Sequence, residues 1–229
     1  MSHHQRRPHE VSNLTDSVSY QMSPFNRWDP ETTLYENAKS VYKYSEPSDV
    51  LKSGALDQAI DYANLKYKGL YRKATSRVPA ALPYIVHPMD VMQRVANLGI
   101  HDIDTLTAAL LHDLLEDTDV QASCLEDAFG AQVRRLVEAM THDKDKDSKS
   151  EYLDNLCTFE IAALIIKLAD RASNVESFKY GNPDYAGLYA QKAESIYRSV
   201  LGRREEIQLH FGRHVCANAT NLANELLNF

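Results

Sequence analysis

The stretch that most constrains this chain is AALLHDLLEDT, residues 108–118. Its apolar run is interrupted by four ionisable side chains, which are His112, Asp113, Glu116 and Asp117. Because residues four apart lie on one face of an α-helix, the spacing predicts a helix that carries an imidazole and three carboxylates along one edge. Ionisable groups on a mostly buried helix are costly unless they are paired or bind a metal. The clustering therefore favours a bound divalent cation.

The alternative is the solvated edge of an ordinary amphipathic helix, and two further stretches argue against it. The motif PYIVHP supplies His87 just before a new periodic segment. The motif IIKLADRASN supplies Asp170 at the end of an apolar run, and Asn174 follows four residues later on the same helical face. A histidine, then an adjacent His-Asp pair, then a distant aspartate resemble the ligand set of the HD-family metal phosphohydrolases. In this chain the set is His87, His112, Asp113 and Asp170.

The atoms of this set indicate a reaction. Two imidazoles and two carboxylates favour a borderline or hard divalent ion such as Mn²⁺, Zn²⁺ or Fe²⁺. Such an ion lowers the pKa of bound water and polarises a phosphoryl group, which implies hydrolysis of a phosphate ester. Glu116 and Asp117 lie one turn beyond the ligands, and we expect one of them to orient or deprotonate the nucleophile. We expect Asn174 to donate a hydrogen bond to a ligand carboxylate or to the substrate.

Composition restricts the partners of the chain. The formal net charge of -7 argues against a large nucleic-acid partner, because phosphate backbones bind broad basic surfaces. The densest positive patch, residues 66–77, is either a solvated loop or a clamp for phosphates. No stretch has the length of a membrane span and no signal peptide is visible, so no membrane partner is expected. Three widely separated cysteines argue against a disulfide framework and indicate a reducing cytoplasm.

The chain divides into two parts. Residues 1–48 hold many turn formers and few periodic apolar positions, which predicts a weakly structured arm. We expect this arm to pack on the domain or on a second subunit, so a homo-oligomer is one possible assembly. Residues 49–229 show helical periodicity and no convincing strand pattern. The predicted fold class is therefore all-α, in one domain.

Capping residues predict several helix boundaries. Asp104 is expected to be the N-cap of the helix that contains the opening motif, which leaves Asp102 in a linker. Ser123 and Glu126 resemble a capping box, and Gly130 resembles a C-cap. Further helices are expected over residues 131–144 (amphipathic), 159–178 (buried) and 217–227 (near the C-terminus).

Five motifs together resemble the hydrolase domain of the RelA/SpoT family, over roughly residues 50–180. They are YRK (71–73), PYIVHP (83–88), AALLHDLLEDT (108–118), FGAQVRRLVEAMTHDK (129–144) and IKLADRASN (166–174). The Glu-Asp pair after His-Asp makes the match more specific than His-Asp alone. No synthetase or regulatory domain is visible, so the chain is most similar to the stand-alone small alarmone hydrolases, among them the metazoan SpoT homologue.

The resemblance implies an all-α HD-domain fold and a Mn²⁺-dependent 3′-pyrophosphohydrolase that converts the nucleotides (p)ppGpp to GDP or GTP and pyrophosphate. The metal ligands that it implies are His87, His112, Asp113 and Asp170. The catalytic residues that it implies are Glu116 and Asp117. The substrate-binding residues that it implies are Arg72, Lys73, Asn174 and Ser177.

The chain departs from the family pattern in one segment. Relatives usually have a short link between the Arg-Lys pair and the Pro-Tyr pair, and here the link is the longer ATSRVPAAL, residues 74–82. A longer link would alter the pocket for the base or the ribose. Two alternatives therefore stay open: a hydrolase of another nucleotide, such as the NADPH 2′-phosphate or adenosine alarmones, and a non-catalytic, antitoxin-like nucleotide-binding partner. The intact Glu-Asp pair argues against the second, because a pure binder would not need it.

Overall fold

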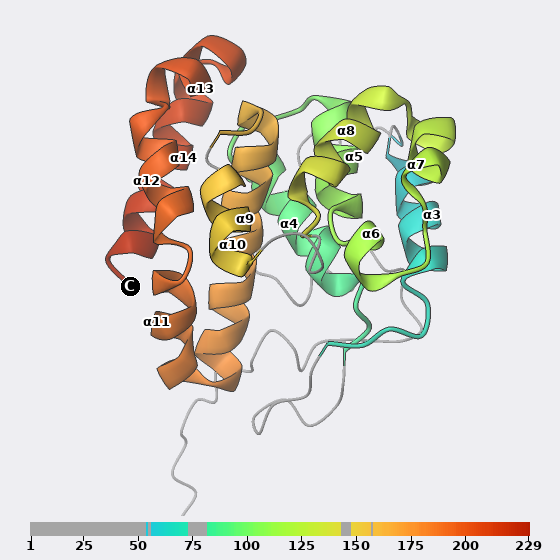
Figure 1. Ribbon diagram of the computed structural model, residues 1–229, viewed down its shortest axis with the longest axis horizontal. Coiled ribbons are helices and arrows are strands. Elements are labelled where there is room, and N and C mark those ends of the chain that lie inside the picture. Colours follow the sequence, from blue (N-terminus) through green and yellow to red (C-terminus); the bar gives the residue numbers. More distant parts are fainter. Residues whose placement is uncertain (1–53, 55, 73–81, 143–147, 157) are drawn as a thin grey trace, which may run out of the picture.

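The computed structural model describes residues 54, 56–72, 82–142, 148–156 and 158–229, and these residues form an array of α-helices (Figure 1). The all-α prediction is confirmed: in the described segments the only β pairing is an isolated bridge between Tyr71 and Pro83. No helix in these segments is both long and apolar enough to cross a membrane. The predicted arm, Lys73 and almost all of the 74–82 link lie outside the described residues.

The helices lie in two groups on either side of one long helix, α10 (Figure 1). In the first group, which runs from α3 to α8, helices α4, α5 and α8 pack against α10. In the second group, which runs from α11 to α14, helices α11, α12 and α14 do so. The first group is α3 (Asp57–Lys66), α4 (Val86–Asn97), α5 (Ile103–Leu111), α6 (Leu114–Asp117), α7 (Ala122–Phe129) and α8 (Ala131–Met140). After α9 (Lys149–Leu156) and α10 (Ile161–Gly181) follow α11 (Pro183–Gln191), α12 (Glu194–Gly202), α13 (Arg204–Phe211) and α14 (Arg213–Leu227).

Helix α10 is central because its N-terminal half is apolar on every side. Each residue from Ile161 to Asp170 is buried. A helix that is covered all round needs apolar residues on all its faces, which explains why this segment reads as an apolar run without amphipathic periodicity, interrupted before Asp170 only by Lys167. The charged residues at its midpoint, Lys167 and Asp170, are therefore held in the interior of the protein.

Helix α8 confirms the amphipathic pattern of its segment. Its buried residues are Val133, Leu136, Val137 and Met140. Gly130 separates α7 from α8 with a φ of 88°, a conformation that glycine adopts without the steric penalty of a Cβ atom. The predicted C-cap is thus confirmed, although α8 ends at Met140, before the predicted boundary. Helix α14 also begins earlier than predicted, at Arg213.

Two N-cap predictions are wrong. The N-cap of α5 is Asp102 rather than Asp104: its carboxylate accepts hydrogen bonds from the Thr105 backbone N–H (2.8 Å) and hydroxyl (2.6 Å). Asp102 has the extended backbone of an N-cap, whereas Asp104 lies inside the first turn, where its charge favourably meets the helix dipole. Ser123 lies inside α7, whose N-cap Gln121 makes no side-chain capping bond, so the capping box is also wrong.

The continuous helix predicted for residues 108–118 is wrong as well. Helix α5 ends at Leu111 and the short α6 starts at Leu114, with the His-Asp pair between them. The Ala109 carbonyl, which residue 113 would engage in an unbroken helix, lies 2.8 Å from the His112 imidazole Nδ1. Asp113 is the N-cap of α6. The bend between α5 and α6 therefore falls at the His-Asp pair, and the backbone N–H groups of Glu116 and Asp117 both bond to the Asp113 carbonyl.

Candidate metal centre and active site

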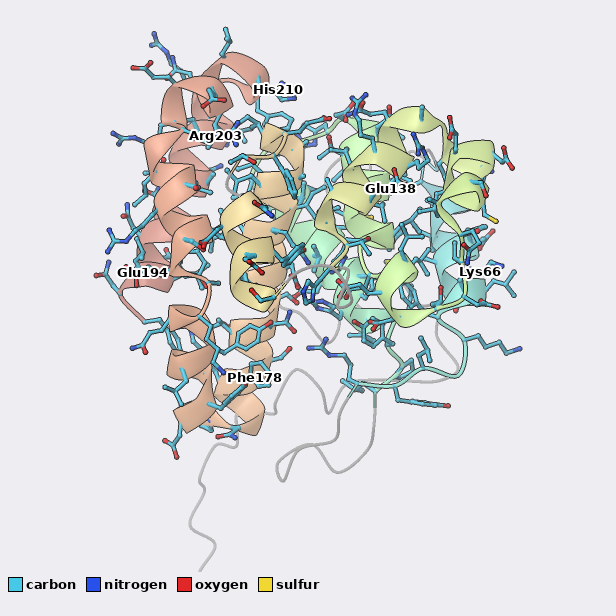
Figure 2. The ribbon with its side chains drawn as sticks, viewed as in Figure 1. Lys66, Glu138, Phe178, Glu194, Arg203 and His210 are labelled. Atoms are coloured by element: carbon cyan, nitrogen blue, oxygen red, sulfur yellow. The ribbon has the colours of Figure 1, made fainter. Side chains whose placement is uncertain are left out.

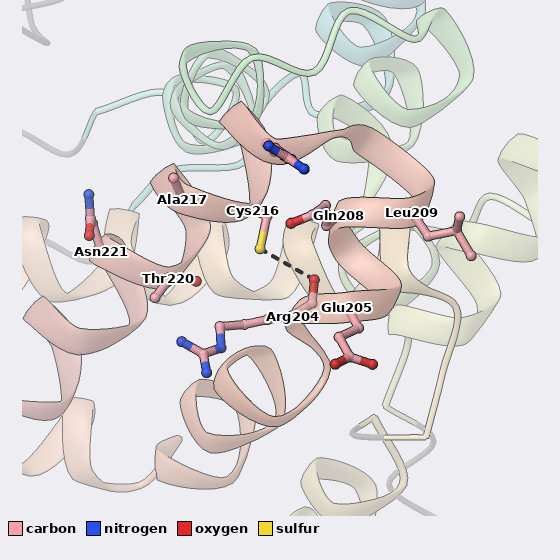
Figure 3. A pocket seen from close by; sticks show the side chains of 9 residues that line it. Arg204, Glu205, Gln208, Leu209, Cys216, Ala217, Thr220 and Asn221 are labelled. Atoms are coloured by element: carbon pink, nitrogen blue, oxygen red, sulfur yellow. Dashed lines mark hydrogen bonds between the residues drawn. The ribbon is translucent and has the colours of Figure 1, made fainter.

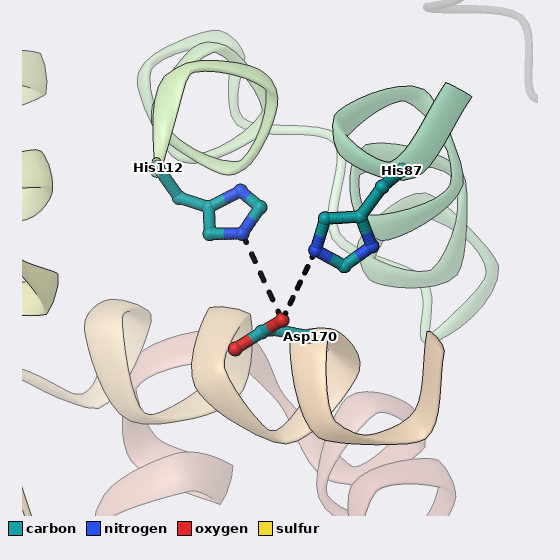
Figure 4. Close-up of side chains that lie close together, drawn as sticks. All are labelled: His87, His112 and Asp170. Atoms are coloured by element: carbon teal, nitrogen blue, oxygen red, sulfur yellow. Dashed lines mark ion pairs between the residues drawn. The ribbon is translucent and has the colours of Figure 1, made fainter. Parts of the chain in front are cut away.

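Three helices bring a histidine-rich cluster together in the interior. His87 comes from the first turn of α4, His112 follows the last turn of α5, and Asp170 lies midway along α10 (Figure 4). One ligand atom from each lies within 4.8 Å of the others, and all three residues are buried. The Asp170 Oδ1 atom is 3.2 Å from His87 Nε2 and 3.8 Å from His112 Nε2.

Asp113 completes this cluster. Its Oδ2 atom lies 3.2 Å from His112 Nε2 and 3.6 Å from His87 Nε2. The same oxygen accepts a hydrogen bond of 2.6 Å from the Tyr84 hydroxyl, a contact that the sequence analysis did not foresee. The structure therefore brings all four candidate ligands together, from three separate sequence motifs.

The second ring nitrogen of each histidine is fixed by the protein. The Nδ1–H of His112 donates to the Ala109 carbonyl, which can only accept, so Nε2 is the atom that faces the cluster. His87 Nδ1 lies 3.0 Å from the Ser173 hydroxyl. Hydrogen bonds of this kind orient metal-binding imidazoles in proteins.

An unsatisfied nitrogen shows that the cluster fits a cation. His112 Nε2 is buried and has no hydrogen-bond partner among the described residues, although two carboxylates face it. The carboxylate oxygens of Asp113 and Asp170 lie 3.2 and 3.8 Å from this nitrogen, and a divalent ion among these atoms would give each of them a partner. Mixed imidazole and carboxylate donors are a set that such ions accept.

The two imidazoles have opposite pKa shifts. Burial would lower the pKa of His112, but the carboxylates of Asp113 and Asp170 outweigh it and raise the pKa to about 10. Burial, helped by the charge of Arg72, lowers the pKa of His87 to about 4 despite the same two carboxylates. In the cation-free protein near neutral pH, His87 is therefore neutral, whereas His112 carries a second ring proton and a positive charge. A metal would take the place of that proton.

Lys167 is a functional-site residue that the sequence analysis missed. It is buried on α10, and its Nζ lies 3.3 Å from Asp170 Oδ2. Burial would raise the pKa of Asp170, but Lys167 first and then the histidines hold it well below its usual value. The signal was a single lysine inside an apolar run, because a charged residue at such a position needs a partner in the interior.

Two of the predicted substrate-binding residues, Arg72 and Asn174, are in direct contact beside the cluster. The Asn174 amide donates a 2.7 Å hydrogen bond to Asp170 Oδ1, as expected. Its oxygen accepts a 3.0 Å hydrogen bond from Arg72 Nη2. Arg72 is thereby tied to the cluster across 102 residues of sequence. Ser177 is half-buried further along α10, and its contact with substrate stays a prediction.

The Glu-Asp pair lies at the rim of the cluster. Glu116 is half-buried and Asp117 is exposed, both on α6. Burial raises the pKa of Tyr84, and the charges of Asp113 and Asp117 add to the rise. Burial also raises the pKa of Tyr152, and Glu116 adds to this rise against the effect of Lys167. The two carboxylates therefore act on different tyrosines beside the cluster.

One cavity of the structure lies apart from this cluster. A cavity of about 900 Å³ is formed by residues of α13 and α14 (Figure 3). Its ionisable lining residues are Arg204, Glu205, Arg213 and Cys216, and the Cys216 thiol donates to the Arg204 carbonyl at 3.3 Å. These residues include neither an imidazole nor a pair of carboxylates, so the hollow offers no metal-ligand set comparable with the cluster.

Known proteins share this arrangement of helices. The family model described as HD domain matches residues 59–208. A solved structure of a metazoan orthologue of SpoT, which hydrolyses ppGpp and plays a role in starvation responses, superposes with a TM-score of 0.62 at 24% identity. That match covers 81% of this chain and 97% of the other, and it shows a common fold.

Sequence comparison identifies nearer relatives. Guanosine-3′,5′-bis(diphosphate) 3′-pyrophosphohydrolase MESH1 of Mus musculus is 38% identical over 166 residues, which are 69% of this chain and 90% of the mouse protein. The bifunctional (p)ppGpp synthase/hydrolase SpoT of Escherichia coli (strain K12) is 32% identical over 179 residues, which are 74% of this chain and 24% of that protein. The chain therefore belongs to the HD-domain family and, within it, to the RelA/SpoT group that its motifs resemble.

Proposed function

We propose that this chain hydrolyses guanosine alarmones, (p)ppGpp, at the 3′ position and depends on a divalent cation. One water is added across the bond between the ribose 3′ oxygen and the pyrophosphate, which yields GDP or GTP and free pyrophosphate. The observation that carries the proposal is the buried cluster of two imidazoles and two carboxylates with an unsatisfied His112 Nε2. The likeness to the mouse 3′-pyrophosphohydrolase supports the choice of substrate.

The proposed cation is Mn²⁺, held by His87, His112, Asp113 and Asp170. Two nitrogen and two oxygen donors suit this ion. When bound, it makes a water more acidic and draws charge from a phosphoryl oxygen. Tyr84 orients Asp113 through its 2.6 Å hydrogen bond, and Lys167 keeps Asp170 ionised. These two residues thus orient one proposed ligand carboxylate and keep the other in its charged form.

Glu116 and Asp117 are the proposed catalytic residues. Both lie on α6, directly after the ligand pair, and the bend at Asp113 sets their helix apart from α5. In this role one carboxylate accepts the proton of the attacking water and the other orients it. Their incomplete burial supports the proposal, because a proton acceptor must reach both substrate and solvent.

The proposed substrate-binding residues are Arg72, Lys73, Asn174 and Ser177. The Arg72–Asn174 hydrogen bond supports a guanidinium beside the cluster, where it could neutralise a phosphate. Asn174 and Ser177 lie three residues apart on α10, which supports contacts to one part of the nucleotide. We also propose a cytoplasmic location, which the free thiols of Cys124 and Cys216 support.

The test is product release from ppGpp by the purified full chain. We expect pyrophosphate and GDP with Mn²⁺, no release after chelation, and recovery when Mn²⁺ is restored. Asp113→Ala should abolish release, and Glu116→Gln/Asp117→Asn should lower it by about 10²–10⁴-fold while Mn²⁺ still binds. Asp127→Asn, an exposed carboxylate on α7, is the matched control and should retain full activity.

Parallel assays with NADPH and adenosine alarmones decide the nucleotide. A higher kcat/KM for either of these than for ppGpp would assign the site to that nucleotide. Full activity in Glu116→Gln/Asp117→Asn would remove the proposed catalytic pair. Release that persists unchanged after chelation would refute the dependence on a cation.

A further inference from the structure

Arg171 is a buried cation beside the cluster. It follows Asp170 on α10, and only 5% of its surface is exposed. Its guanidinium carbon lies 5.0 Å from the centre of the Tyr189 ring on α11. Its Nε atom is buried and has no hydrogen-bond partner in the part of the chain that the structure describes. The side chain is therefore held in place by an aromatic ring and not by an acid.

The charge of Arg171 is left without a carboxylate of its own. No Asp or Glu of the described segments forms an ion pair with it. Asp170 is the neighbouring acid, but its Oδ1 accepts from Asn174 and its Oδ2 faces Lys167. Burying a cation without an anionic partner is costly, and arginine stays charged at every physiological pH. An anion supplied from outside the chain would remove this cost.

Tyr189 indicates where that anion would lie. Burial raises the pKa of its hydroxyl to about 12 against the effect of Arg171, and the charges of Asp170, Lys167 and Arg72 also act on it. Arg171 directly follows the proposed ligand Asp170 on α10, and its guanidinium rests on Tyr189. Both residues therefore lie beside the cluster at which the substrate is proposed to bind.

The geometry of α10 leads to the same region. Lys167, Arg171 and Asn174 are spaced four and three residues apart, so they lie along one face of the helix. Lys167 and Asn174 both contact Asp170. Phe178, which is labelled in Figure 2, continues this face. Its ring centre lies 4.9 Å from that of Tyr189. The aromatic pair fixes the ring on which the guanidinium of Arg171 rests.

We propose that Arg171, held on Tyr189, is a substrate-binding residue that contacts the phosphate groups released from the nucleotide. This assignment rests on the proposed function, because it takes the substrate to be a nucleotide cleaved at the cluster. A planar guanidinium presents two parallel N–H donors that match two phosphoryl oxygens. Stacking on a fixed ring orients this fork before the substrate arrives, which reduces the entropy lost on binding.

The experiment uses Arg171→Met, which removes the charge at similar length, and Arg171→Lys, which keeps a charge without the fork. Inorganic pyrophosphate is the probe, added to the Mn²⁺-loaded full chain with the cation in excess. Arg171→Met should weaken pyrophosphate binding by about tenfold or more, and Arg171→Lys by less. The KM for ppGpp should rise more than kcat falls. Arg198→Met, an exposed arginine paired with Glu194, should match the wild type.

Stability separates a binding role from a structural one. If Arg171 is a buried cation without a partner, the ligand-free melting temperature of Arg171→Met should equal or exceed that of the wild type. A structural arginine would show the reverse, because its loss removes packing. A clearly lower melting temperature, or pyrophosphate affinity equal to the wild type, overturns the proposal.

The two proposals fail in different ways. A chain that binds pyrophosphate through Arg171 but leaves ppGpp intact would refute the proposed function and keep the anion site. A chain that hydrolyses ppGpp with the same KM in Arg171→Met would keep the function and refute the role of Arg171.

Discussion

The two sides of α10 treat their charged groups differently. Towards α4, the Ser173 hydroxyl lies 3.0 Å from His87 Nδ1, and the buried Asp90 carboxylate pairs with Arg94 at 2.9 Å. Towards α11, Arg171 rests on an aromatic ring, and no acid in the described segments pairs with it. On the α4 side the buried polar groups pair with other protein groups, whereas on the α11 side a buried cation has no acid of the described segments as its partner.

The difference indicates two kinds of preorganisation. Groups that must hold a small ion need neighbours that fix their orientation, and the α4 side supplies these neighbours from within the protein. Groups that bind a larger anion need a positive charge that no carboxylate of the protein neutralises. On the α11 side, Arg171 is the charge proposed for this role. Asp170 lies between the two sides and serves both.

The largest expected effect comes from the residue that the two sides share. Asp170→Asn removes a proposed ligand charge while it keeps the size of the side chain. We expect ppGpp hydrolysis to fall by about 10³-fold or more, because the charge stabilisation that a bound ion provides is worth several kcal/mol. Steady-state kinetics with Mn²⁺ titration measure the loss. Activity within tenfold of the wild type would show that the cluster is not the reaction centre.

Ser173→Ala tests the α4 side alone. It removes the hydroxyl 3.0 Å from His87 Nδ1 and leaves all four proposed ligands in place. Loss of such an orienting partner typically lowers metal affinity about 10–100-fold. Calorimetric titration with Mn²⁺ measures the change, and pyrophosphate affinity at saturating Mn²⁺ should not change. If both affinities fall equally, the two sides are not independent.

The pH dependence of metal affinity tests the unequal histidines. Without a cation, the pKa of His112 is raised to about 10, whereas that of His87 is lowered to about 4. Metal binding between pH 6 and 8 must therefore release the His112 proton, while His87 is already neutral. The apparent Mn²⁺ affinity should rise about tenfold per pH unit over this range. A flat profile would show that His112 carries no proton to release.

Arg94→Met compares the cations on the two sides. It leaves the fully buried Asp90 without its ion-pair partner, so the free energy of unfolding should fall by about 1 kcal/mol or more. Arg171→Met should cause no such fall. Chemical denaturation measures both, with Arg198→Met as the exposed control. Equal losses for Arg94→Met and Arg171→Met would remove the contrast between the two sides.

Much of the site could be predicted because its residues stand out locally. His112 and Asp113 interrupt an apolar run, and Asp170 ends another. Each stands out because a buried ionisable group is costly unless it is paired or binds a metal. The amphipathic face of α8 could be predicted equally well, because its apolar residues recur with the period of an α-helix. Signals of this kind depend only on neighbours in sequence.

Other features depend on contacts that no local pattern encodes. The bend between α5 and α6 falls where the His112 imidazole lies 2.8 Å from the Ala109 carbonyl, and Asp102 is the N-cap through its bonds to Thr105. Tyr84 meets Asp113 only because α4 packs against α5. Such juxtapositions are decided by tertiary packing, and in the sequence these residues look ordinary.

The placement of so many roles on α10 has a consequence for sequence change. Lys167, Asp170, Arg171, Ser173 and Asn174 all lie within about two turns of one helix. A single inserted or deleted residue ahead of them would rotate the whole set by about 100°. That rotation would displace several groups together: the Lys167 counter-charge, the proposed ligand Asp170, the proposed anion-binding Arg171 and the Ser173 contact to His87. Point substitutions can change these roles one at a time, whereas a change of helix register changes all of them together.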